Sequence, residues 1–222
     1  MKKGVVVLGY SLEEPNWKQT VWGEPPNLAG RVVTGTAVLL EENCDLMIIS
    51  GGGSYQGKSE ACWMKECLYE RLETLKEFQI YKVFRKFTTR EIKKRLYTTL
   101  RLEEKSKNAT EKIINSLHIL REAGVKKMTI ITSPDHTPWT FRETFIQSRK
   151  YYPEVSAYIF VTASMTLYSE RTPEDKEIAK MENVVIAEPP IAKTLNLARV
   201  MNVLGNPEAV AEIDKLLRKF EQ

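Results

Sequence analysis

The glycine-rich segment at residues 51–59 is the part of the sequence whose residue types and spacing most directly suggest ligand chemistry. Residues 52–59 match the spacing of the phosphate-binding P-loop, and they follow an apolar run and precede a helical pattern. In a P-loop, backbone N–H groups surround the phosphates; here Lys58 would reach the terminal phosphate and Ser59 would hold magnesium. Because no apolar run ends in an obvious metal-binding aspartate, a nucleoside triphosphatase or kinase is an alternative hypothesis and not the leading one.

The same glycines could bind a ligand without hydrolysing a nucleotide. Glycine allows a ligand to approach the backbone closely, and the N-terminus of the helix that follows attracts an anion. We therefore expect a ligand cradle formed by Gly51, Gly52, Gly53 and Ser54. A plain tight turn is the structural alternative for this segment.

Three side chains are candidates for acid–base chemistry, namely Glu60, Glu103 and His136. Histidine titrates near neutral pH, and burial can raise the pKa of a carboxyl group toward that range. His136 follows an apolar run and precedes Thr137-Pro138, where we expect Thr137 to be the N-cap of a helix. Glu60 precedes a predicted helix, and the helix dipole favours a negative charge at that position whether or not the residue has a catalytic role. The sequence has no G-x-S-x-G motif and no evident Ser-His-Asp arrangement.

Further candidates could position a ligand. The Arg31 guanidinium could donate two hydrogen bonds to one phosphate or carboxylate. The alternative is that Arg31 is a surface residue of a helix. Asn108 could orient a polar group, but Asn108 and Glu111 also have the spacing of a helix capping box, which alone would explain both. The remaining predicted ligand-binding residues follow other apolar runs; they are Gly9, Tyr10, Ser11, Thr132 and Ser133.

Apolar runs that alternate with helical patterns must position these residues. The runs are 4–8, 46–50, 128–132, 157–162 and 184–187, with a weaker one at 97–102. The alternation predicts a three-layer, doubly wound α/β fold with a mainly parallel, Rossmann-like sheet. We expect a single domain over residues 1–222 that contains a basic helical insertion at 78–96. In such a sheet ligands bind beyond the carboxyl ends of the strands, so the candidates above should share one edge.

Composition and charge exclude several other classes of protein. The chain has 222 residues and a net charge of +4, and it lacks a run of about 18 apolar residues that could cross a membrane. Three cysteines without a C-x-x-C pair and only two histidines do not predict a metal site. We expect a cytoplasmic protein without membrane insertion.

The net positive charge is concentrated in residues 82–107, which carry ten Lys or Arg and three Asp or Glu. We expect a solvated helical surface there and do not expect nucleic acid as the partner. A non-catalytic regulatory or nucleic-acid-binding module that uses this segment is the third hypothesis.

The order of the motifs resembles the SanA–ElyC–YdcF family of bacterial proteins, and the soluble YdcF-like branch in particular. The resemblance rests on Val5-Val6-Val7-Leu8-Gly9, Arg31 with Ala37 and Leu40, Ile48-Ile49-Ser50-Gly51-Gly52, Ser59-Glu60-Ala61 with Met64, the segment 102–111, and Thr132-Ser133 with His136. The chain departs from the family pattern at Ala109, Lys112 and Trp139, where the family has Thr, Asn and usually Arg.

The resemblance implies a Rossmann-like fold and leaves the activity open, because most activities in this family are unassigned. Together with the residues above, it makes an anionic small-molecule ligand the leading hypothesis. The ligand would be nucleotide-like or adenosyl, with a nucleotide and S-adenosylmethionine as the candidates. Transferase and hydrolase reactions are the types of chemistry considered.

Overall fold

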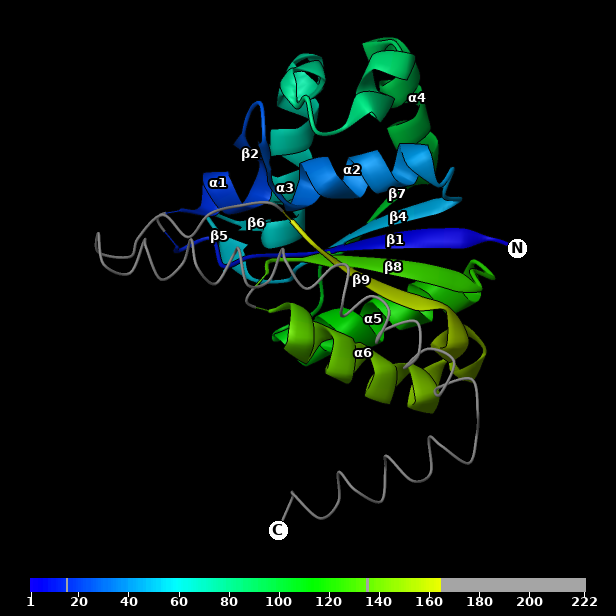
Figure 1. Ribbon diagram of the computed structural model, residues 1–222. Helices are drawn as coiled ribbons and strands as arrows, with labels where there is room; N and C mark the ends of the chain where they lie inside the picture. Colours follow the sequence, from blue (N-terminus) through cyan, green and yellow to red (C-terminus); the bar gives the residue numbers. More distant parts are fainter. Residues whose placement is uncertain (15, 135, 165–222) are drawn as a thin grey trace. The chain divides into compact units, whose positions relative to one another are not determined.

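Five parallel strands form the central sheet of the computed structural model, which describes residues 1–14, 16–134 and 136–164 (Figure 1). In spatial order the strands are β7 (Leu100–Glu103), β4 (Leu46–Ser50), β1 (Lys3–Leu8), β8 (Lys127–Thr132) and β9 (Ile159–Ala163). Counted along the chain, this is the order 3-2-1-4-5 of a doubly wound Rossmann-like sheet. The predicted α/β fold class is confirmed.

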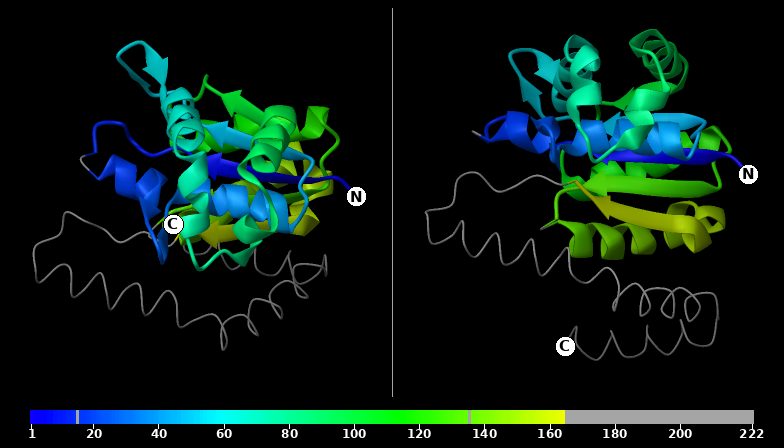
Figure 2. Two further views of the ribbon diagram at one scale, coloured as in Figure 1. Left: turned by 90° about the horizontal axis from the view of Figure 1, so that it is seen from above. Right: turned by 45° about the horizontal axis from the view of Figure 1, so that its top comes forward.

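Helices cover both faces of the sheet and make it a three-layer structure (Figures 1 and 2). One face carries α2 (Arg31–Glu41), α3 (Glu60–Glu70) and α4 (Thr89–Thr99). The other face carries α5 (Ala109–Glu122) and α6 (Thr137–Tyr151). Parallel strands that are covered on both faces explain why the strand sequences are almost continuously apolar.

The side chains of β1 alternate between two hydrophobic cores. Val5 and Val7 belong to the first core cluster, which also contains the buried residues of α2 and α3. Val6 and Leu8 belong to the second core cluster, together with Ile113 of α5. Consecutive residues of a strand point to opposite faces, so this one strand anchors both helical layers.

A helical excursion precedes β7 and overlaps the segment 78–96 that was expected to be an insertion. It consists of two 3₁₀ segments, η1 (Leu72–Glu77) and η2 (Lys82–Lys86), followed by α4. Buried Phe78 and Phe84 attach it to the first core cluster. A capping box between Thr88 and Glu91 starts α4, which continues to Thr99. The weak strand predicted at 97–102 was therefore wrong in its first residues, because they complete this helix.

Shorter elements connect these layers. The connection from β1 to α2 contains α1 (Trp17–Val21) and a small antiparallel pair, β2 (Gly23–Glu24) with β3 (Leu28–Ala29). The strand predicted at 157–162 begins instead at Ile159, because a 3₁₀ segment, η3, occupies Pro153–Tyr158.

Some expectations concern residues outside those that the structure describes. They are the strand at 184–187 and the last part of the single domain. Within the described residues, no helix is long and apolar enough to cross a membrane.

Candidate functional site

A cleft of about 320 Å³ opens where the carboxyl ends of β1 and β8 meet. Successive connections leave β1 and β8 in opposite directions across the sheet, which makes this the topological switch point where doubly wound folds bind ligands. The residues that line the cleft are Leu8, Gly9, Tyr10, Ser11, Glu14, Arg31, Ala109, Lys112, Thr132, His136, Trp139 and Thr140.

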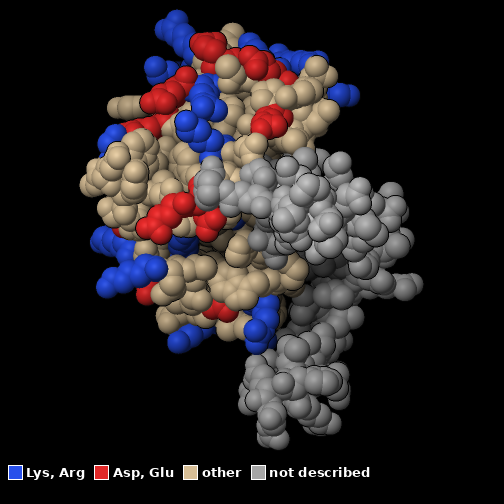
Figure 3. Space-filling view, turned by 90° about the vertical axis from the view of Figure 1, so that its left-hand side faces the viewer, with Lys and Arg blue, Asp and Glu red and all other residues tan. Residues whose placement is uncertain are grey.

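The two sides of the cleft come from different layers of the fold. The segment after β1 and the start of α2 supply one wall, which includes Tyr10, Glu14 and Arg31. The first turns of α5 and α6 supply the other wall, which includes Lys112 and Trp139. Figure 3 views the carboxyl edge of the sheet, where acidic and basic side chains are interspersed. The described lining of the cleft likewise includes both the acidic Glu14 and the basic Arg31 and Lys112.

Arg31 is a buried arginine that ties the first wall together. Its Nη1 donates to the carbonyl oxygens of Leu8 at 2.9 Å and Gly9 at 2.7 Å, and its Nε donates to Ser133 Oγ at 3.0 Å. Its guanidinium carbon lies 5.1 Å from the centre of the Tyr10 ring, within cation–π range. Arg31 thus fixes the backbone after β1 and orients Tyr10, in addition to lining the cleft.

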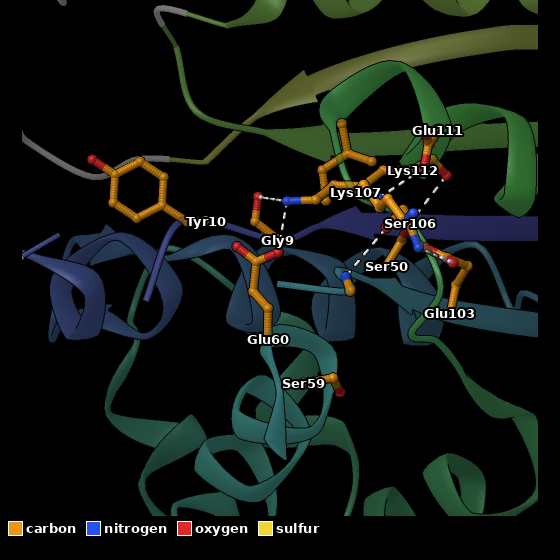
Figure 4. A network of polar contacts seen from close by, with 12 residues as sticks. Gly9, Tyr10, Ser50, Ser59, Glu60, Glu103, Ser106, Lys107, Glu111 and Lys112 are labelled. Carbon is orange, nitrogen blue, oxygen red and sulfur yellow. Dashed lines mark hydrogen bonds and ion pairs between the residues drawn. The ribbon is translucent and has the colours of Figure 1, made fainter. Parts of the chain in front are cut away.

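A buried ion pair joins the two faces of the sheet beneath Gly9 (Figure 4). Lys112 Nζ lies 2.6 Å from Glu60 Oε2 and donates to the Gly9 carbonyl oxygen at 3.3 Å. The Glu60 side chain is 3% exposed and that of Lys112 is 15% exposed. A Cβ atom on Gly9 or on Gly51 would overlap the Glu60 carboxylate. These two glycines therefore make room for Glu60.

Glu103 is buried, and protein donors surround its carboxylate (Figure 4). Its Oε1 accepts from the backbone N–H groups of Lys105 and Ser106 and from Asn115 Nδ2, at 2.8 to 3.0 Å, and its Oε2 accepts from Ser50 Oγ at 2.6 Å. Burial raises the pKa of Glu103, but the hydrogen bonds from these four residues outweigh it and hold the pKa below the usual range. These contacts give Glu103 the role of a loop anchor.

Because its pKa is lower in the folded state, Glu103 stabilises the protein above its unfolded-state pKa of about 4.3, and this stability is lost as the pH falls through the folded-state pKa. Glu103→Gln should therefore cost about 1–3 kcal/mol of unfolding free energy near neutral pH and much less near pH 3. Urea unfolding across this pH range measures the difference. Glu122→Gln, at an exposed position of α5, is the control for lost charge. A Glu103→Gln deficit that does not change with pH would contradict this assignment.

The glycine-rich segment does not have the geometry of a P-loop. Ser54–Tyr55 (β5) and Lys58–Ser59 (β6) pair as an antiparallel hairpin. Gln56 and Gly57 both have positive φ, as the tight turn of such a hairpin requires. The Lys58 ammonium lies 2.8 Å from the carboxylate of Glu66. This fold corrects the expectation that the segment surrounds a phosphate with its amides.

Other polar groups of this segment are also occupied by the protein. The N–H of Gly51 donates to the Glu103 carbonyl oxygen at 2.9 Å, and the N–H of Gly52 donates to Ser106 Oγ at 3.2 Å. Ser59 Oγ accepts from the N–H of Cys62 at 3.0 Å and thereby caps α3. The segment thus serves as a connection between β4 and α3.

Asn108 and Glu111 cap α5. Asn108 Oδ1 accepts from the N–H of Glu111 at 2.9 Å, and the Glu111 carboxylate accepts from Asn108 Nδ2 and from the N–H of Lys107. At α6 the predicted cap differs. His136 is the N-cap residue, without a side-chain cap, and Thr137 begins the helix. The Thr137 hydroxyl donates to the Ser133 carbonyl oxygen at 3.0 Å instead of capping.

The cleft contains six of the predicted site residues, namely Gly9, Tyr10, Ser11, Arg31, Thr132 and His136. The remaining predicted site residues do not line the cleft; they are Gly51, Gly52, Gly53, Ser54, Lys58, Glu60, Glu103, Asn108, Glu111 and Ser133. Glu60 reaches the cleft only through Lys112.

Six lining residues were not predicted as site residues, namely Leu8, Glu14, Ala109, Lys112, Trp139 and Thr140. Ala109, Lys112 and Trp139 line the cleft from the first turns of α5 and α6. Their closeness in the sequence to the predicted residues Asn108, Glu111 and His136 was the available signal for this wall of the cleft.

The basic segment 82–107 contributes no residue to the cleft. Across residues 1–14, 16–134 and 136–164, no group of three or more His, Cys, Asp or Glu side chains is arranged to hold a metal ion. Comparison with protein-family models, with curated proteins and with solved structures finds no match to this chain.

Proposed function

We propose that this chain binds a small anionic molecule, nucleotide-like or adenosyl, in the cleft between β1 and β8, and that it is a relative of the YdcF-like proteins. The observation that carries this proposal is the position of the cleft at the switch point of the sheet, with aromatic and cationic side chains around it. The donors present suit a phosphate or a carboxylate, which nucleotides and S-adenosylmethionine respectively carry.

Two aromatic rings support the choice of a ligand with a flat ring system. Tyr10 and Trp139 line the cleft from opposite walls. Trp139 is 37% exposed, so part of its ring is accessible to a ligand. Stacking of a base on an aromatic side chain contributes about 1–3 kcal/mol and does not require hydrogen bonds to the base.

The reaction class that fits this cleft is proton transfer by His136 in a transferase or hydrolase reaction. Of the three predicted acid–base residues, His136 alone lines the cleft. Glu60 would act as a positioning residue because it contacts Lys112, and Glu103 would hold the loop at 104–106. A histidine needs no large pKa change to serve as a base near neutral pH.

Trp139→Ala should weaken binding of the ligand about tenfold or more because it removes a stacking surface, whereas Trp139→Phe should keep most of the affinity. The ligand is first found by a thermal-shift screen of AMP, ATP, S-adenosylmethionine and sugar phosphates, since a bound ligand raises the melting temperature. Calorimetric titration then measures the dissociation constants of both variants.

Tyr97→Ala is the aromatic control for this experiment. Tyr97 lies on α4, is 85% exposed and does not line the cleft. Its loss should leave both the affinity and the melting temperature unchanged. Equal weakening by Tyr97→Ala and Trp139→Ala, or no stabilisation of the wild-type protein by any compound of the screen, would contradict the proposal.

A further inference from the structure

Helix α6 buries two threonine hydroxyls that have no hydrogen-bond partner. Thr140 and Thr144 are both 0% exposed, and among the described residues neither Oγ1 atom has a partner. A hydroxyl that loses water without gaining a partner costs about 1–3 kcal/mol. The two positions differ in one respect, because Thr140 lines the cleft and Thr144 does not.

The beginning of α6 also faces the cleft. The helix has 15 residues, its N-cap residue His136 makes no side-chain cap, and His136, Trp139 and Thr140 all line the cleft. The N–H of Thr137 donates to the Pro134 carbonyl oxygen at 3.2 Å, and the N–H of Thr140 donates to the His136 carbonyl oxygen at 2.8 Å. What the start of α6 offers the cleft is therefore the partial positive charge of the helix dipole. Helix α5 starts at the same wall with Ala109.

Lys112 adds a donor on this wall. A lysine ammonium carries three N–H bonds, and the contacts with Glu60 and the Gly9 carbonyl oxygen use two of them. The side chain lines the cleft, so the third N–H is available to a ligand there. Among the described residues that line the cleft, the carboxylate is that of Glu14, which comes from the opposite wall. The wall formed by α5 and α6 therefore presents donors.

We propose that the first turn of α6, together with Thr140 and Lys112, is a subsite for a phosphate group. The phosphate oxygens accept from Thr140 Oγ1 and Lys112 Nζ and interact with the positive end of α6. This subsite rests on the proposed function of the cleft and specifies which part of the ligand binds to which wall. A phosphate attached to a nucleotide and free inorganic phosphate offer the same chemistry, and the test separates them.

The test compares Thr140→Val with Thr144→Val, a matched pair one helical turn apart. Valine keeps the shape of threonine and removes an unpartnered hydroxyl, so both variants should melt at or above the wild-type temperature when no phosphate is present. Sodium phosphate should raise the melting temperature of the wild-type protein and of Thr144→Val above that in sodium chloride of equal ionic strength. Thr140→Val should bind phosphate about tenfold or more weakly, and Thr140→Ser should restore binding.

AMP and adenosine distinguish the subsite from the function of the cleft. AMP should bind the wild-type protein at least tenfold more tightly than adenosine, and Thr140→Val should abolish most of that difference. Adenosine that binds as tightly as AMP, or a Thr140→Val variant that retains the wild-type preference for AMP, would overturn the subsite while leaving the cleft as a nucleoside site. A melting temperature that does not respond to phosphate would also overturn it. Binding of phosphate without binding of AMP or adenosine would retain the subsite and overturn the nucleotide-like ligand.

Discussion

Lys112→Met is expected to destabilise the fold by about 3–5 kcal/mol, because it leaves the Glu60 carboxylate buried without a counter-ion. The measurement is the urea dependence of unfolding at neutral pH, followed by circular dichroism. The exposed pair of Lys58 with Glu66 provides the comparison. Lys58→Met should change stability little, since water solvates the carboxylate that it leaves behind.

A double variant tests whether the charge or the volume is responsible. Glu60→Leu combined with Lys112→Met replaces the ion pair by apolar side chains and should recover most of the lost stability. If the double variant is no more stable than Lys112→Met alone, the loss comes from packing around α5 and α3 and not from an unpaired charge.

Gly52→Ala and Gly53→Ala should have opposite effects although the two residues are adjacent. A Cβ atom on Gly52 would overlap the Ser106 carbonyl oxygen and lie 2.7 Å from the Ser106 nitrogen and 2.8 Å from the Glu104 carbonyl oxygen. All three are backbone atoms of the loop that Glu103 anchors, so we expect a loss of about 3 kcal/mol or more. A Cβ atom on Gly53 meets no atom within 4 Å.

Gly53→Ala should therefore be neutral or stabilising by about 0.4–1 kcal/mol, because alanine restricts the unfolded chain. Chemical denaturation of both variants checks the pair. Similar losses in the two variants would mean that the loop at 104–106 moves easily, and would contradict the close contact between Gly52 and Ser106.

The sequence predicted the fold well because its signals are local or depend on a repeating pattern. The apolar runs at 4–8 and 46–50 correspond to β1 and β4 within one residue. The capping spacing of Asn108 and Glu111 likewise corresponds to an observed cap. The order of the strands was not predicted, because doubly wound sheets have more than one common strand order. The start of β7 was misplaced because α4 extends as far as Thr99, which the local pattern does not show.

The site was less predictable because it depends on pairings between distant segments. Lys112 and Glu60 lie on different helices, and no local spacing relates them. The glycines illustrate a second limit. The composition of residues 51–57 is compatible with a ligand loop, a P-loop or a hairpin. The conformation that forms depends on contacts with Glu103 and Ser106, which are distant in the sequence.

The two walls of the cleft rest on separate hydrophobic cores. Tyr10 packs against the first core cluster, whereas α5, which carries Lys112, is anchored in the second. A molecule held by both walls would act as a cross-link between the layers above and below the sheet. Its binding should slow amide hydrogen exchange in α2 and in α5 together, although these helices lie on opposite faces. Loosening of either core should likewise weaken binding, because each core positions half of the groups that hold the ligand.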